Sequence, residues 1–152
     1  MINKEISKNT QQNKQVTVSQ LMQAPFATGS LIVNFNQNQI TLDGEKLVLQ
    51  PKVVELLIIL CATNGKTISK QELIEQLWPD TIVGPDSLAN TMTRLRKALN
   101  DDAKNPQFIK TVQRKGYLWL PPVKNVTKSN RALPSKKSMI LLSILLFGCL
   151  LY

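Results

Sequence analysis

The chain has 152 residues, 43% of them hydrophobic, which suits one globular domain with flanking segments and excludes a wholly disordered protein. It has no histidine, and its two cysteines, Cys61 and Cys149, lie in separate apolar segments, so we expect neither an enzyme, nor a metal site, nor a bound cofactor. The formal charge is +9, and the segment after Asp102 contains lysine and arginine but no acidic residue, which indicates nucleic acid or an anionic membrane as a partner.

The first part of the chain is predicted to be an arm followed by a small sheet. Residues 1–28 are rich in Asn, Gln and Lys and show no periodicity, so we predict a flexible polar arm without a fold. Three β-prone runs follow, "SLIVNF", "QITL" and "KLVL". Asp43 and Gly44 between the last two are a strong signal for a hairpin turn. These runs predict an antiparallel sheet.

Two helices are expected next. In "PKVVELLIILCATNG", Pro51 suits the first helical position and Gly65 suits the position just past the helix. The helix is apolar enough to be mostly buried. In "SKQELIEQLW", Ser69 and Glu72 have the spacing of a capping box, in which each side chain bonds the other residue's backbone N–H. The segment "PDTIVGPD" then ends this second helix.

The stretch "SLANTMTRLRKALN", residues 87–100, predicts a third helix with two distinct faces. At about 100° per residue, one stripe is apolar and suits the core. It consists of Leu88, Met92, Leu95 and Leu99. The opposite face is polar and basic, and it consists of Asn90, Thr93, Arg94 and Lys97.

Two β-prone runs, "FIKTV" and "YLWL", close the pattern as a hairpin around the basic turn "QRKG", where Gly116 can supply a positive φ. Two helices joined by a short break and followed by a basic hairpin are the order of a winged helix-turn-helix. A helix about 10–12 Å across fits the major groove, which is about 12 Å wide. The alternative is that the polar face is an ordinary solvated helix surface.

Four motifs carry a resemblance to a known family: "LDGEKLVLQPKVVELL", "SKQELIEQLW", "RLRKAL" and "NPQFIKTVQRKGY". Together they resemble the winged-helix DNA-binding domain of the OmpR/PhoB type, which we place at residues 29–121. The resemblance implies an α+β fold with an N-terminal four-stranded antiparallel sheet, three helices and a C-terminal β-hairpin wing. It also implies transcription regulation through double-stranded DNA, with a homodimer on repeated half-sites.

The resemblance implies roles for particular residues. Asn90, Thr93 and Arg94 are expected to contact DNA bases, and the helix wheel adds Lys97 to them. The expected contacts to the DNA backbone are Thr91, Arg96 and Thr111, together with Arg114 and Lys115 at the hairpin tip. The loop that faces RNA polymerase in some members corresponds to Pro79, Asp80, Thr81, Ile82, Val83, Gly84 and Pro85.

The chain also departs from the family pattern. Gln113 stands where many members have an arginine in the wing, and Thr93 replaces a frequent arginine, so neither minor-groove insertion nor the target sequence can be taken over from relatives. Arg96 has a salt-bridge role as its alternative. Trp78 and Trp119 are interpreted as packing residues rather than base-stacking ones, and the alternative for Thr111 is a plain strand residue.

The C-terminal tail predicts membrane attachment. A basic linker, residues 122–138, precedes the uncharged segment "MILLSILLFGCLLY", residues 139–152. As a helix, this segment would measure about 21 Å against a hydrocarbon core of about 30 Å, so we predict a C-terminal apolar helix that is a short or truncated transmembrane segment. Basic residues before it favour a cytoplasmic N-terminal side. The arrangement resembles the ToxR/CadC-like regulators, which implies a single pass through the bacterial inner membrane.

Two questions stay open at this stage. The chain is expected to be a truncated form or an N-terminal piece of a longer protein, the alternative being a tail-anchored regulator that relies on a separate sensor partner. The leading functional hypothesis is a membrane-anchored, sequence-specific transcription regulator. Its alternatives are a winged-helix module that docks another regulator or RNA polymerase and binds DNA weakly, and a soluble regulator with an incidental apolar tail.

Overall fold

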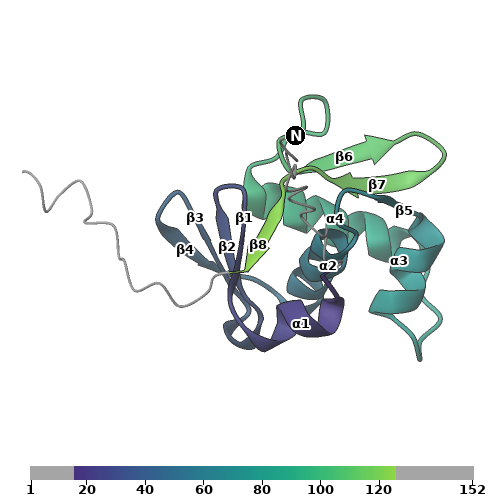
Figure 1. The fold of residues 1–152 in the computed structure, drawn as a ribbon. Helices are drawn as coiled ribbons and strands as arrows, with labels where there is room; N and C mark the ends of the chain where they lie inside the picture. The colour runs from purple at the N-terminus through teal and green to yellow at the C-terminus, as the bar shows by residue number, and fades with distance from the viewer. Residues whose placement is uncertain (1–15, 126–152) are drawn as a thin grey trace, which may run out of the picture.

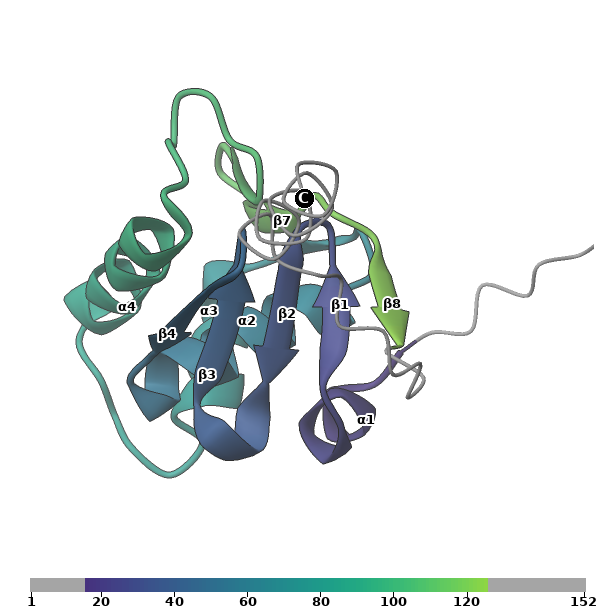
Figure 2. The same ribbon diagram turned by 90° about the vertical axis from the view of Figure 1, so that its left-hand side faces the viewer.

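The computed structural model describes residues 16–125, which form two antiparallel sheets with helices between and beside them (Figures 1 and 2). The helical elements are α1 Val18–Gln23, the 3₁₀ helix η1 Phe35–Gln37, α2 Pro51–Ala62, α3 Lys70–Leu77 and α4 Pro85–Leu99. The strands are β1 Phe26–Thr28, β2 Leu31–Asn34, β3 Gln39–Leu42, β4 Glu45–Val48, β5 Thr67–Ile68, β6 Ile109–Val112, β7 Gly116–Trp119 and β8 Val123–Asn125.

The first sheet has the strand order β4-β3-β2-β1-β8, and all its neighbours pair antiparallel. The predicted hairpin turn is confirmed: Asp43 and Gly44 both have positive φ, 50° and 87°, as a type I′ turn between β3 and β4 requires. Leu31, Val33 and Ile40 are buried on one face, because side chains alternate across a strand. That face lies against the helices, as Figure 2 shows.

Helix α2 is the centre of the core. Pro51 is at its first position, as predicted, and its buried side chains run from Val53 to Cys61 with Glu55 as the one interruption. Cys61 is fully buried, and burial raises the pKa of its thiol well above the usual value. The helix ends at Ala62, and Gly65 follows in the turn with φ 77°.

The predicted capping box of α3 is confirmed. Glu72 N donates to Ser69 Oγ at 3.1 Å, and Ser69 N donates to Glu72 Oε2 at 2.8 Å. The hydrogen bonds from the Ser69 backbone N–H and then its side chain lower the pKa of Glu72. The reciprocal bonds satisfy two backbone donors at the helix start.

The prediction of an arm without a fold is wrong for its last residues. Helix α1 begins with its own capping box at Thr17 and buries Leu21, while β1 pairs with β2 and buries Phe26. The apolar residues here are too few and too irregularly spaced to produce a periodic signal. They are nonetheless large, and Leu21 and Phe26 belong to the same buried hydrophobic cluster as the residues of α2 and of the following strands.

The predicted boundary at residue 121 is also wrong, because β8 follows it and pairs with β1 at the edge of the first sheet. The sheet implied as four-stranded is therefore five-stranded. Thr28 connects β1 to the end of β7 and the residues after it. Trp119 Nε1 donates to the Thr28 hydroxyl at 2.8 Å, and this hydroxyl donates to Pro121 O at 3.4 Å. These contacts bring the end of β7 to the first sheet, where the chain continues as β8.

The second sheet has the order β5-β7-β6, and its β6–β7 hairpin is the predicted wing. Gly116 has φ 142°, and a Cβ there would lie 1.9 Å from Ile68 O. The glycine is therefore needed for the close approach of β5 as well as for the positive φ. The tip of the hairpin consists of residues 113–115, and Arg114 adopts φ 60° there.

The predicted C-terminal apolar helix, the transmembrane segment at residues 139–152 and most of the basic linker lie outside the described residues, as does the start of the N-terminal arm. Within residues 16–125, the structure contains no helix that is both long and apolar enough to cross a membrane.

Candidate DNA interface

Helix α4 separates its residues as the sequence predicted. The stripe Leu88, Met92, Leu95 and Leu99 is buried. The outer face of α4, defined here by Asn90, Thr93, Arg94 and Lys97, is exposed at every position. The helix begins at Pro85 and ends at Leu99. The next residue, Asn100, is left-handed, and Asp101 N donates to Arg96 O at 2.9 Å. Core packing thus fixes the helix and leaves one polar face free.

Arg94 has a partner from a distant part of the sequence. Its Nη1 donates to Oε1 of Gln50, the residue immediately before α2. Neither ion pair found within residues 16–125 includes Arg94. Its partner is a neutral side chain, so the hydrogen bond does not neutralise the positive charge of Arg94. The remaining N–H groups of the guanidinium can donate to an acceptor outside the protein.

The two threonines on α4 make local bonds. Thr91 Oγ1 donates to Ser87 O and Thr93 Oγ1 donates to Ala89 O, each at 2.8 Å. Thr91 is buried, whereas Thr93 is exposed on the outer face. Each hydroxyl has used its hydrogen inside the helix, so towards an external group it can act only as an acceptor.

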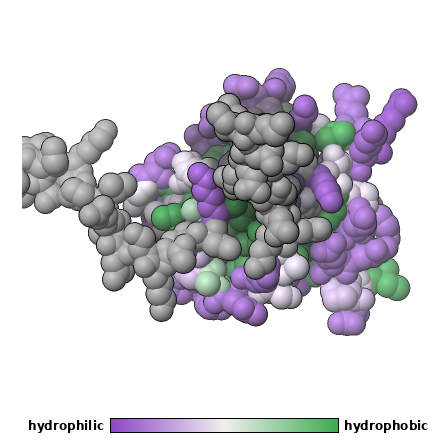
Figure 3. Space-filling model, viewed as in Figure 1, coloured by the Kyte–Doolittle hydropathy of each residue, from purple (hydrophilic) through white to green (hydrophobic). Residues whose placement is uncertain are grey.

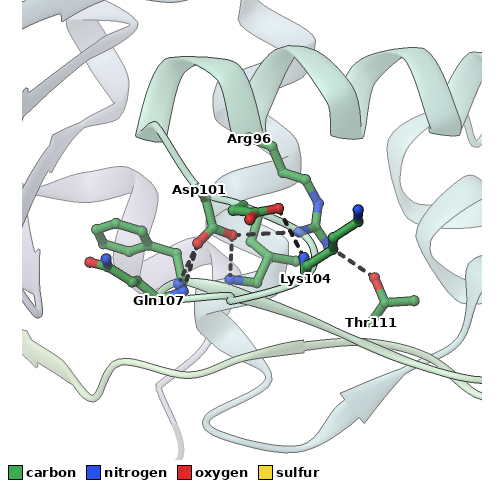
Figure 4. A network of polar contacts seen from close by, with 8 residues as sticks. Arg96, Asp101, Lys104, Gln107 and Thr111 are labelled. Atoms are coloured by element: carbon green, nitrogen blue, oxygen red, sulfur yellow. Dashed lines mark hydrogen bonds and ion pairs between the residues drawn. The ribbon is translucent and has the colours of Figure 1, made fainter.

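Arg96 points away from the outer face, into a polar network between α4 and the wing (Figure 4). Its Nη2 donates to Thr111 Oγ1 at 2.9 Å, and its Nη1 lies 3.7 Å from Asp101 Oδ2. The Arg96 side chain is 12% exposed and that of Asp101 is 0% exposed. We call Arg96, Asp101 and Thr111 the α4–wing junction. This geometry favours the salt-bridge interpretation of Arg96, and its phosphate contact stays a prediction.

Asp101 is the centre of this junction, and the sequence analysis did not single it out. Its Oδ1 accepts from the backbone N–H groups of Gln107 at 2.7 Å and Phe108 at 3.0 Å, and its Oδ2 accepts from Ile109 N at 3.0 Å. One buried carboxylate therefore fixes the start of β6 against the end of α4. The only sequence signal for this role is weak: Asp101 follows Asn100, and asparagine is a residue that often ends a helix.

The tip of the wing is exposed and basic. Gln113, Arg114 and Lys115 are all exposed. Figure 3 shows a mostly hydrophilic surface over the side of the molecule that carries α3 and the wing. Trp119, by contrast, is buried against Phe108 with ring centroids 5.7 Å apart, and Trp78 is half-buried, which agrees with packing roles for both.

The loop between α3 and α4 differs from its predicted bounds. Pro85 is the first residue of α4 and not part of the loop, because its fixed φ and missing N–H suit that position. The preceding residues from Pro79 to Gly84 do connect the two helices, and Ile82 is fully exposed within them. An interaction of this loop with RNA polymerase stays a prediction.

A protein family and several individual proteins match this chain. The family described as "Transcriptional regulatory protein, C terminal" matches residues 44–119, half of the chain. The chain belongs to the OmpR/PhoB-type family of transcription regulators. The matched segment extends from the β3–β4 turn to the end of β7 and so includes α2, α3, α4 and the wing.

Individual relatives agree with the family match. The transcriptional activator CadC of Escherichia coli strain K12 is 35% identical over 104 residues, covering 67% of this chain but 20% of CadC. The solved DNA-binding domain of E. coli CadC superimposes with a TM-score of 0.61 at 31% identity, covering 68% of this chain and 98% of that domain. The Klebsiella pneumoniae RstA DNA-binding domain, solved in complex with the RstA box, gives 0.57 at 32% identity, covering 62% and 95%.

The OmpR/PhoB-type domain of this chain is therefore a transcription regulator's DNA-binding domain with an α+β winged-helix fold, and not an enzyme. The chain spans about a fifth of the length of its curated relative CadC. The matched segment does not include α1, the strands β1, β2 and β3, or β8.

Proposed function

We propose that this protein is a sequence-specific regulator of transcription that binds double-stranded DNA through α4 and the wing. The observation that carries the proposal is the outer face of α4: a rigid helix exposes Asn90, Thr93, Arg94 and Lys97 with no acidic side chain among them. Arginine can bond guanine O6 and N7 together, and asparagine can bond adenine N6 and N7. The relative RstA, solved with DNA bound, supports this use of the fold.

The remaining predicted contacts are assigned to positioning on the DNA. Arg114 and Lys115 at the wing tip are exposed cations suited to phosphate oxygens. Thr111 and Arg96 contact each other between the wing and α4. We assign them to the DNA backbone only through the polar groups that are not used in the α4–wing junction. The hydroxyl of Thr91 is buried and bonded within the helix, so its proposed backbone contact is the weakest of the set.

We further propose that residues 139–152 attach the protein to the bacterial inner membrane, with the DNA-binding domain in the cytoplasm. Sequence supports this: the segment carries no charge and follows a basic linker. Binding as a homodimer on repeated half-sites, contact of the loop before α4 with RNA polymerase, and a separate sensor partner belong to the same proposal. The likeness to CadC, a transcriptional activator, supports the regulatory role alone.

Selection and titration test the DNA-binding proposal. Duplexes recovered from a random pool by the chain are titrated beside scrambled duplexes of the same composition, at two salt concentrations. We expect selective binding that weakens steeply with salt, because each neutralised phosphate releases counterions. Recovery of no preferred sequence, together with weak binding to every duplex, would contradict the proposal and favour the protein-docking alternative.

Cell fractionation tests the membrane proposal. The chain is expected in the inner-membrane fraction, and a variant lacking residues 139–152 is expected in the soluble fraction with the same affinity for DNA. If the intact chain is soluble, the apolar tail is incidental and the anchoring proposal fails without affecting the DNA-binding one.

A further inference from the structure

The side chains of Gln50 and Arg94 are hydrogen-bonded although the two residues are 44 positions apart in sequence. Gln50 lies at the N-cap of α2, where its side chain makes no capping hydrogen bond. The N-caps of α1 and α3, Thr17 and Ser69, both cap their helices through their side chains. Glutamine is also not among the residues favoured at this position. The amide oxygen of Gln50 instead accepts a hydrogen bond from Arg94 on the outer face of α4.

The backbone of Gln50 is held on both sides. Leu49 N donates to Asn38 O at 2.8 Å, and the Gln50 carbonyl accepts from Val53 N at 2.9 Å and Val54 N at 3.2 Å. Pro51 restricts the residue before it to extended backbone, and Gln50 has φ −67° and ψ 144°. The amide therefore projects from a fixed point in the fold and can serve as a fixed acceptor for a flexible arginine.

We propose that Gln50 is a positioning residue for Arg94, a role that rests on the proposed DNA-reading function of α4. One hydrogen bond to a neutral acceptor restricts the rotamers of the long arginine side chain before DNA arrives, which reduces the entropy lost on binding. A carboxylate in the same place would neutralise the charge and compete with guanine. The amide oxygen orients the guanidinium and leaves its charge intact.

The test is a set of variants of the 152-residue chain, measured on the duplex selected by the unsubstituted protein and on its single base-pair variants. Arg94→Ala first identifies the base pair that Arg94 reads, as the position where discrimination is lost. Gln50→Met keeps the length of the side chain and removes the acceptor. It is expected to reduce discrimination at that same base pair roughly 2- to 10-fold, the range of one net hydrogen bond. Affinity for scrambled DNA is expected to stay unchanged.

Two further variants separate positioning from other roles. In the Arg94→Ala background, Gln50→Met is expected to have no further effect, because the positioned group is gone. Gln50→Glu is expected to lower specific affinity more than Gln50→Met does, because it pairs with the arginine and repels phosphate. Gln76→Met, at an exposed glutamine beside α1, is the matched control and is expected to change nothing.

The outcomes are distinguishable. A loss that persists in the Arg94→Ala background and is equal on all duplexes would mean that Gln50 contacts DNA directly, and it would overturn the inference. No change in base-pair discrimination with Gln50→Met would also overturn it. Failure of the protein to select any sequence would instead contradict the proposed function itself.

Discussion

Helix α4 carries two arginines two positions apart, and they differ in exposure and in their partners. On the outer face, Arg94 is exposed and bonded to the neutral amide of Gln50. At the α4–wing junction, Arg96 is mostly buried beside the carboxylate of Asp101 and bonded to Thr111. A basic residue on α4 is therefore not by itself evidence of a DNA contact. The two arginines differ in their partners, since Arg96 lies beside a carboxylate and Arg94 beside a neutral amide.

The largest expected effect comes from removing the carboxylate at the junction. Asp101→Ala leaves three backbone N–H groups without their acceptor and Arg96 without its ion-pair partner. We expect the free energy of unfolding to fall by about 3–5 kcal/mol, as for other broken buried pairs. Denaturant titration followed by circular dichroism measures it. Asp102→Ala is the control, since Asp102 is exposed and accepts only from Lys104 N. Equal losses for both would contradict the central role of Asp101.

The next effect separates the two arginines. Arg94→Ala is expected to lower affinity for a selected duplex by about 1–3 kcal/mol and to leave affinity for scrambled DNA nearly unchanged, because it loses base contacts. Arg96→Ala is expected to lower stability and to leave the ratio of specific to scrambled affinity unchanged. Fluorescence anisotropy on both duplexes measures these ratios. If Arg96→Ala, in a folded protein, changes the ratio of specific to scrambled affinity as much as Arg94→Ala does, the two arginines do not have different roles.

A smaller effect is expected at Thr111. Thr111→Val keeps the β-branched shape favoured in β6 and removes the hydroxyl that accepts from Arg96 Nη2. We expect a loss of about 0.5–1.5 kcal/mol in the free energy of unfolding, the usual net value of one hydrogen bond. Thermal unfolding measures it, with Thr67→Val on the exposed part of β5 as the matched control. An unchanged free energy of unfolding for Thr111→Val would contradict a stabilising role in the α4–wing junction and would leave Thr111 with the proposed DNA-backbone contact alone.

The smallest expected effect is at the tip of the wing. Lys115→Ala removes one exposed cation and is expected to weaken binding to all duplexes similarly, reducing the slope of log affinity against log salt by about 1. Titrations at several salt concentrations measure this slope. Lys66→Ala, an exposed lysine in the turn after α2, provides the comparison variant. An unchanged slope for Lys115→Ala would place the wing tip away from the phosphates.

Much of the fold was predictable because its signals are local. The capping box of Ser69 and Glu72 and the turn at Asp43 and Gly44 each depend on residues a few positions apart. The outer face of α4 was predictable for the same reason, since helical periodicity alone separates it from the buried stripe. Helix α1 and strands β1 and β8 were missed, because their few apolar residues acquire a role only in the tertiary structure, where α1 packs against α2 and β1 pairs with β2 and β8.

The sequence by itself determined the order of the elements from β2 to β7, the family and the exposed face of α4, since these follow from spacing along one stretch of chain. Only the tertiary structure decided which arginine on that helix lies beside a carboxylate and which lies beside a neutral amide. The partners that decide it, Gln50 for Arg94, and Asp101 with Thr111 for Arg96, come from other elements or from beyond the helix end. Hydrogen bonds and ion pairs act over a few ångströms in space whatever the separation in sequence, so no local pattern contains them.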